Sequence, residues 1–235
     1  MKFIEGIRGK HTGEKIWVAG SGKSLDDYPI DFFKDKVCIG MNWVFAAFTD
    51  IGDGLEKFKT RAFYSVHEHS EPAEDLVKYA PHLLKDCFFL LPPSRRDTPR
   101  RMVWWEDYND DPTYMRWGLV GHGGVRASDE EFEEMAKCIM EKKDECYYVC
   151  RCTTLHWAID AAVVLGAKKI CLVGADRTGP GNRGHAQEHG LSAFYSSTPI
   201  AKRPFWEGGT RALMSIFGEY GIEIVFYYYG KGEQV

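Results

Sequence analysis

The chain has 235 residues, of which 44% are hydrophobic, and its net charge is −4 with acidic and basic residues mixed along its length. This length suits a single domain over residues 1–235 with a full core, and the mixed charge indicates neither a nucleic-acid-binding nor a membrane surface. No apolar run approaches the roughly 20 residues of a membrane span, and the first ten residues lack the apolar segment of a signal peptide. We therefore expect a cytoplasmic protein without a membrane span.

The seven cysteines are expected to be mostly reduced in that compartment. Cys150 and Cys152 are separated by one residue, whereas zinc sites use C-x-x-C pairs, and no second pair follows at a suitable distance. Cys38, Cys87 and Cys171 lie in apolar runs, which is typical of small core residues. We therefore predict no cysteine metal site.

The first half of the chain alternates apolar runs with polar segments. Runs that are apolar on both faces predict buried strands at Lys15–Ala19, Val37–Met41, Ala62–Val66 and Cys87–Leu91. A short helix is predicted over Ser24–Asp35, with Ser24 as its N-cap and acidic residues in its first turn. A second helix is predicted over Pro72–Tyr79, with its proline near the start.

Residues 92–127 interrupt this alternation and form a predicted insertion or lid. The segment contains several arginines and tryptophans, which can bind phosphates or stack on bases and sugars. An irregular surface subdomain that packs its tryptophans inward explains the same composition. The sequence leaves both interpretations open.

The second half returns to regular elements. Helices are predicted over Ser128–Lys143, Cys152–Leu165 and Phe205–Tyr220, and strands over Lys169–Val173 and Ile222–Tyr228. Gly166 directly follows the second of these helices, where a C-terminal glycine is common. Strands that alternate with helices indicate an α/β fold with a mainly parallel sheet and helices on both faces.

The first predicted strand ends in the turn Gly20-Ser21-Gly22-Lys23-Ser24, and such glycine turns commonly bind phosphate. Gly22-Lys23-Ser24 resembles the end of a P-loop, but Trp17 stands where that motif has its first glycine. A plain strand-to-helix turn is the alternative interpretation. Ligands of parallel sheets bind outside the carboxyl ends of the strands. This rule places Gly20–Ser24, Asn42 and His67–His69 at one edge.

Two stretches together resemble a known family. The first is V-A-G-S-G-K-S-L at Val18–Leu25 followed by I-G-M-N at Ile39–Asn42. The second is Thr153-Thr154 followed by A-x-x-L-G-A-K-K-I-C-L-V-G-A-D at Ala162–Asp176. The order of these motifs is similar to that in bacterial lipooligosaccharide sialyltransferases. It is also similar to that in archaeal-type hydroxymethyl-dihydropterin pyrophosphokinases.

The resemblance implies a Rossmann-like nucleotide-binding domain and a nucleotide-sugar donor, with a CMP-type donor favoured. Carried over by position, the residues that it implies for nucleotide binding are Gly20, Ser21, Gly22, Ser24, Asn42, Thr153 and Thr154. Asp176 would orient a ribose, a metal or an acceptor hydroxyl. Lys23 departs from the family, which usually has proline at this position.

The resemblance also guides the choice of catalytic residues. The two tyrosines that help the phosphate to leave in the sialyltransferases have no counterpart, but Arg177 and Arg183 occupy that loop and suit the same electrostatic task. The family's histidine before the last main helix is also absent. His185 and His189 are therefore our candidate bases, because histidine titrates near neutral pH. Two solvated loop histidines are the alternative.

Three functions remain open from the sequence. The first is a nucleotide-sugar-dependent glycosyltransferase that transfers a sugar to an acceptor hydroxyl, and we favour it. The second is an ATP-dependent pyrophosphokinase acting on a small alcohol, which would need Mg²⁺ and carboxylate ligands such as Asp176, with Glu68 or Asp160. The third is a non-catalytic nucleotide-binding module.

Overall fold

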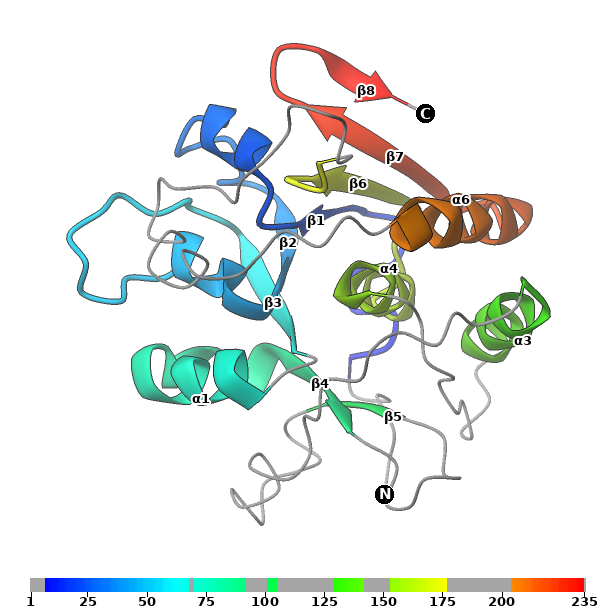
Figure 1. The fold of residues 1–235 in the computed structure, drawn as a ribbon, viewed down its shortest axis with the longest axis horizontal. Coiled ribbons are helices and arrows are strands. Elements are labelled where there is room, and N and C mark those ends of the chain that lie inside the picture. The colour runs from blue at the N-terminus through cyan, green and yellow to red at the C-terminus, as the bar shows by residue number, and fades with distance from the viewer. Residues whose placement is uncertain are drawn as a thin grey trace.

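The computed structural model describes residues 7–67, 70–91, 101–104, 129–141, 153–176 and 204–234. Within these ranges the chain has an α/β fold around an eight-stranded sheet of order β5-β4-β3-β2-β1-β6-β7-β8 (Figure 1). The strands are β1 (Lys15–Ala19), β2 (Val37–Met41), β3 (Ala62–His67), β4 (Cys87–Leu91), β5 (Arg101–Trp104), β6 (Lys169–Val173), β7 (Glu223–Tyr228) and β8 (Gly232–Gln234).

Four α-helices and three 3-10 helices connect the strands in the described ranges. The α-helices are α1 (Ser70–Tyr79), α3 (Asp129–Met140), α4 (Thr154–Val164) and α6 (Pro204–Glu219). The 3-10 helices are η1 (Lys23–Asp27), η2 (Asn42–Ala47) and η3 (Pro81–Asp86).

The six inner strands, from β4 across to β7, run parallel. This confirms the mainly parallel sheet that the continuous apolar runs predicted, and β1, β2, β4 and β6 have the predicted bounds. The outer strands β5 and β8 pair antiparallel with β4 and β7, and the sequence did not predict them. β5 falls within the predicted 92–127 insertion, and the rest of that segment lies outside the described residues.

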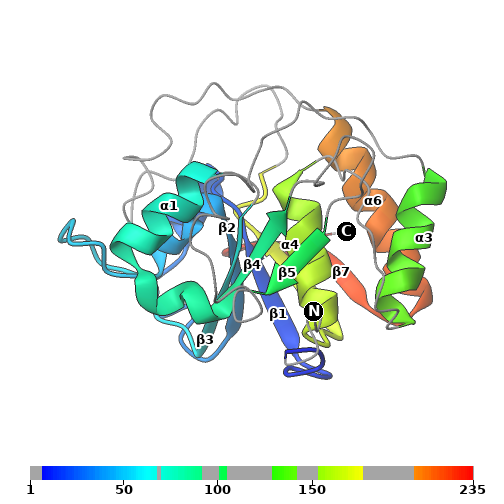
Figure 2. The ribbon, with the colours of Figure 1, turned by 90° about the horizontal axis from the view of Figure 1, so that it is seen from below.

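Helices cover both faces of the sheet, as predicted. α3, α4 and α6 lie together on one side, whereas α1, η1 and η2 lie on the other (Figures 1 and 2). The first face is centred on α4, in which every residue from Leu155 to Val164 is buried. The second face is rich in aromatic side chains, among them the buried Trp17, Phe33 and Phe58.

Residues 9–13 close the end of α4 at the amino-terminal edge of the sheet. Alternate amides from Gly9 to Gly13 donate hydrogen bonds of 2.8–2.9 Å to the carbonyls of residues 164–166. These contacts satisfy carbonyls that a helix end otherwise leaves without partners. Gly166 has a φ of +93°, which confirms the predicted glycine at the end of this helix.

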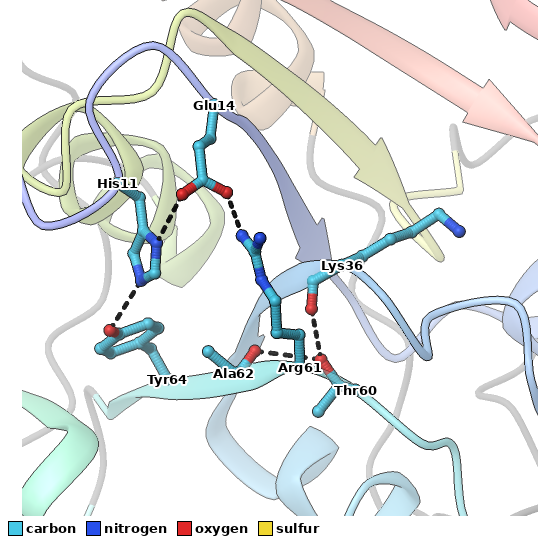
Figure 3. Close-up of polar contacts among 7 residues, drawn as sticks. All are labelled: His11, Glu14, Lys36, Thr60, Arg61, Ala62 and Tyr64. Carbon is cyan, nitrogen blue, oxygen red and sulfur yellow. Dashed lines mark hydrogen bonds and ion pairs between the residues drawn. The ribbon is translucent and has the colours of Figure 1, made fainter.

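A polar network lies at the same edge and joins this segment to β3 (Figure 3). The Nδ1 atom of His11 donates to Glu14 over 3.2 Å, and its Nε2 atom bonds to the Tyr64 hydroxyl over 2.9 Å. Arg61 donates to the other oxygen of Glu14, and this hydrogen bond lowers the pKa of Glu14. Because Tyr64 is buried, the network fixes the segment against the sheet.

The helix predicted over Ser24–Asp35 is wrong. The chain forms only the 3-10 helix η1 and then turns through residues 31–35. Gly22 occupies the N-cap position of η1, and no side chain caps it. The hydrogen-bonding groups of Ser24 are used elsewhere, as described below.

The other helices agree with the prediction apart from their ends. α3 ends at Met140, and α4 begins at Thr154 with Thr153 as its N-cap. Cys38 and Cys171 are buried core residues, as predicted, and neither forms a disulfide. None of the helices described is long and apolar enough to cross a membrane.

Candidate functional site

The strand order reverses at β1. The chain adds β2, β3 and β4 on one side of β1 and then returns to place β6 and β7 on the other. The carboxyl ends of β1 and β6 therefore lie side by side, with Ala19 paired to Val173. In open parallel sheets, ligands bind outside the strand ends where this reversal occurs. The Gly20–Ser24 turn and Gly174–Asp176 both follow strands that end at this point.

These two segments are packed too closely for larger residues. The amide of Gly20 donates to Val173 over 2.8 Å, and that of Gly22 donates to Gly174 over 2.7 Å. A Cβ atom on Gly20 would lie 2.5 Å from the Gly174 carbonyl oxygen. A Cβ atom on Gly22 would lie 2.6 Å from Oδ2 of Asp176. Both glycines are therefore required by close backbone approach.

Asp176 fixes the far end of the turn. Its Oδ2 accepts a hydrogen bond of 2.9 Å from the Ser24 amide, and its Oδ1 accepts a bond from the Ser24 hydroxyl. We call this pair the Ser24–Asp176 clamp. Because both oxygens already accept a bond from Ser24, the clamp gives Asp176 a structural task. Its predicted role toward a ribose, a metal or an acceptor hydroxyl stays a prediction.

Lys23 lies at the outside of the turn. Its side chain is exposed and makes no ion pair or hydrogen bond to any residue within the described ranges. The amides of Gly20, Gly22 and Ser24 are bonded within the fold. Lys23 is thus the basic group that this turn presents outward, next to the partly exposed Ser21.

Asn42 lies on the other side of β1, directly after β2. Its φ of +49° is in the left-handed region, which asparagine tolerates better than most residues. Its Nδ2 atom donates to Oγ1 of Thr154 over 3.3 Å. This bond joins the end of β2 to the first turn of α4. The structure thus brings Asn42 and Thr154 together, as the predicted site requires.

Thr153 precedes α4 but does not cap it with its side chain. Its Oγ1 atom is buried and has no hydrogen-bond partner in the part of the chain that the structure describes. The first turn of α4 contains no acidic residue. The positive partial charge of this helix end is therefore not balanced by a side chain of the helix itself.

Two of the histidines in the described ranges are buried. His67 ends β3, is 0% exposed, and bonds through Nε2 to the Ser65 hydroxyl over 2.8 Å. Burial lowers the pKa of His67 to about 3, so its imidazole is neutral at physiological pH. His156 is packed in α4 against Thr210 of α6, with 3.2 Å between Nε2 and Oγ1. His156 is therefore a packed residue of the core.

Sequence reasoning missed a group of aromatic rings beside the turn, which we call the aromatic wall: Tyr28, Phe32, Tyr227 and Tyr229. Their neighbouring ring centroids lie 4.9–6.4 Å apart. The Tyr28 hydroxyl donates to the Tyr227 carbonyl over 2.6 Å. Burial raises the pKa of Tyr28, and the nearby charge of Asp176 adds to this effect. The run of tyrosines at 227–229 was a visible signal, but the partner Tyr28 lies far away in sequence.

Several predicted site residues fall outside the described ranges: His185, His189, Arg177 and Arg183. His69 and Glu68 are also outside them. Among the residues that the structure describes, no group of three or more His, Cys, Asp or Glu side chains could hold a metal.

Comparisons with protein-family models, with curated proteins and with solved structures found no match to this chain. The candidate site therefore stands on its geometry and on the sequence motifs alone.

Proposed function

We propose that the chain is a Rossmann-like, nucleotide-sugar-dependent glycosyltransferase whose nucleotide binds at the Gly20–Ser24 turn. The observation that carries the proposal is the Ser24–Asp176 clamp, which holds a glycine turn at the point where the strand order reverses. Ligands of open α/β sheets bind at this point, and a nucleotide is a common one.

The phosphate of the donor would lie outside the turn. Three turn amides are already bonded within the fold, so the binding role falls to Lys23 and to the helix end of α4. Lys23 supplies a full positive charge, and the first turn of α4 supplies a partial one. Thr153 and Thr154, at that helix end, would add hydroxyl contacts.

The nucleoside would lie on the β2 side of the turn. Asn42 follows Gly22 by 20 residues and lies directly after the second strand. In dinucleotide-binding sheets, a polar residue at about this spacing binds the ribose. The Asn42 side chain faces Thr154 and so lies between β2 and α4, where a ribose hydroxyl could reach both.

In the reaction, the acceptor oxygen loses its proton and forms a bond to the sugar carbon, while the bond from that carbon to the phosphate oxygen breaks. We assign the removal of the proton to His185 or His189. We assign the stabilisation of the negative charge on the departing phosphate to Arg177 and Arg183. These assignments rest on the sequence. The buried, neutral His67 is not part of this step, because its ring does not reach solvent.

A pyrophosphokinase is the competing function. It needs Mg²⁺ held by carboxylates. The candidate ligands from the sequence are Asp176 with Glu68 or Asp160. Asp160 is 0% exposed in the middle of α4, away from the strand ends. Asp176 is bonded to Ser24 through both oxygens. This geometry favours the glycosyltransferase.

The test is a thermal-unfolding screen with CMP, UDP, GDP and ATP, each with and without Mg²⁺. A nucleotide present at about 100 times its Kd stabilises the folded protein by about 2.7 kcal/mol. We expect CMP to raise the melting temperature without added metal. Stabilisation by ATP only with Mg²⁺ would favour the pyrophosphokinase. If no nucleotide changes the melting temperature, the proposal is wrong.

An assay of turnover then distinguishes an enzyme from a non-catalytic binding module. A CMP-sugar donor should release CMP in the presence of a hydroxyl acceptor, and His185→Ala or His189→Ala should slow that release. Nucleotide binding without release from any donor would instead favour a non-catalytic module.

A further inference from the structure

Tyr229 has an unusual position among the exposed large hydrophobic residues. Within the described ranges these are Leu55, Val77, Tyr79, Tyr220 and Tyr229. Tyr79 and Tyr220 end segments that lead back to the amino ends of strands. Only Tyr229, which is 44% exposed, directly follows the carboxyl end of a parallel strand, β7. It therefore lies at the same edge as the candidate nucleotide site.

The ring of Tyr229 contacts two other rings of the aromatic wall. Its centroid lies 5.7 Å from that of Tyr28 and 5.8 Å from that of Phe32. Tyr229 also begins the short turn between β7 and β8, in which Gly230 has a φ of +74° and Lys231 donates to the Tyr228 carbonyl over 3.0 Å. A tyrosine held in this way offers contact area with little conformational entropy to lose on binding.

The aromatic wall is continuous with the Ser24–Asp176 clamp. Tyr28 directly follows η1, whose residue Ser24 is bonded to Asp176. In Figure 1 the dark-blue turn that contains η1 lies beside the end of β7. The exposed ring is thus part of the surface that carries the proposed donor site.

We propose that Tyr229 is the stacking surface for a pyranose ring of the acceptor substrate. This inference rests on the proposed function. One face of a pyranose presents C–H groups, whose partial positive charge suits the negative face of an aromatic ring. The tyrosine hydroxyl at the ring edge can bond to a sugar hydroxyl.

The arrangement of the strands favours the acceptor over the nucleoside as the occupant. Asn42 follows β2, on one side of β1, whereas Tyr229 follows β7, two strands away on the other side. At the usual strand spacing, β7 lies about 10 Å from β1. A nucleoside bound at Asn42 therefore extends away from Tyr229, and the reacting end of the donor points toward it.

The experiment compares Tyr229→Ala with Tyr229→Phe and with the control Tyr220→Ala, which removes a tyrosine of similar exposure, 42%, at the opposite edge. CMP binding to the full chain is measured by thermal unfolding. Lactose and methyl α-D-mannopyranoside are then titrated into the CMP-saturated protein and followed by saturation-transfer NMR.

We expect at least one of these saccharides to bind the wild-type protein. Tyr229→Ala should raise its Kd about 10-fold, as for the loss of one well-packed aromatic contact. Tyr229→Phe should stay close to wild type, because the ring still packs on Tyr28 and Phe32. Tyr220→Ala should change nothing, and CMP binding should be equal in all four proteins.

Three results would overturn the inference. The first is that neither saccharide binds the CMP-loaded wild type. The second is that Tyr229→Ala binds the saccharides as Tyr220→Ala does. The third is that Tyr229→Ala weakens CMP binding, which would mean that the ring stacks on the base. In all three, CMP still binds the wild type and the proposed function stands. Failure of every nucleotide to stabilise the wild type defeats the proposed function and this inference together.

Discussion

Asp176 accepts hydrogen bonds from both the amide and the hydroxyl of Ser24, although 152 positions separate the two residues in the chain. The clamp joins the segments that follow the two strands at the reversal of strand order. It explains why the turn after β1 has one shape, and it allows the role of Asp176 to be tested.

Asp176→Ala should destabilise the protein and weaken nucleotide binding, whereas Asp176→Asn should be milder. Alanine leaves two donors of Ser24 without their acceptors, at a cost of about 1–3 kcal/mol. An asparagine oxygen still accepts from the Ser24 amide, and its NH₂ group can donate to the Ser24 hydroxyl. Urea unfolding and CMP titration measure the two effects. If Asp176→Asn binds CMP normally but loses turnover, Asp176 acts in the chemistry as well.

Gly22→Ala should disturb the site, whereas Gly218→Ala should not. The added Cβ at position 22 would meet Asp176 at 2.6 Å, so the clamp must open or shift. Position 218 lies in α6, where an added Cβ meets nothing within 4 Å. We expect Gly22→Ala to lower stability by about 1–3 kcal/mol, as for an overpacked site, and to reduce CMP affinity. Equal behaviour of the two variants would contradict the close contact.

Asn42→Gly and Asn42→Ala distinguish the effect of the backbone conformation of Asn42 from the effect of its side chain. Glycine adopts a φ of +49° freely, whereas alanine is strained there by about 1 kcal/mol. We therefore expect Asn42→Ala to unfold at a lower urea concentration than Asn42→Gly. Both variants lose the bond to Thr154 and should bind CMP more weakly. Normal CMP binding by Asn42→Gly would mean that the Asn42 side chain does not take part in the site.

Lys23→Gln should weaken CMP binding about 5-fold, which corresponds to about 1 kcal/mol for an exposed charge contact. Stability should be unchanged, because Lys23 makes no ion pair within the described ranges. Lys34→Gln, at an exposed lysine of the following turn, is the control. The difference between the variants should shrink as the salt concentration rises. Complete loss of binding in Lys23→Gln would instead indicate a P-loop-like role.

His67 should make stability depend on pH. Its pKa is lowered to about 3 by burial, so protons bind preferentially to the unfolded chain, where histidine titrates near 6.5. The stabilising contribution is complete above about pH 6.5 and is lost progressively as the pH falls toward 3. Between pH 7 and pH 5 we expect a loss of about 2 kcal/mol. His67→Gln, which can still bond to Ser65, should lack this part of the pH dependence in urea unfolding.

Local patterns predicted the inner strands because burial on both faces leaves a strong signal. Ile16 to Ala19 form one apolar run, and β1 has the bounds that this run indicates. The outer strand β8 is only Gly-Glu-Gln, and nothing in that composition favours a strand. It forms because β7 offers unpaired backbone groups beside a tight turn.

The site was only partly visible in the sequence. The glycine turn, Asn42 and Thr154 could be named as candidates because each directly follows or begins a predicted element. The misplaced helix at Ser24 has a physical cause: the Ser24 amide and hydroxyl both donate to a carboxylate far along the chain, which holds Ser24 inside η1 instead of at an N-cap position. The aromatic wall was missed for the same reason, since Tyr28 meets Tyr229 only after β7 has joined the sheet.

The three residues of β8 also affect how one copy of the chain meets another. β8 covers the outer edge of β7, and Glu233 within it pairs with Lys169 and Lys15. Without β8, the backbone hydrogen-bonding groups at the outer edge of β7 could pair with a strand of another chain. Such pairing is favoured because β7 is an apolar segment of high β-propensity. A short, charged, glycine-flanked strand is a poor template for further pairing. β8 therefore completes the sheet and also hinders strand pairing between copies of the chain.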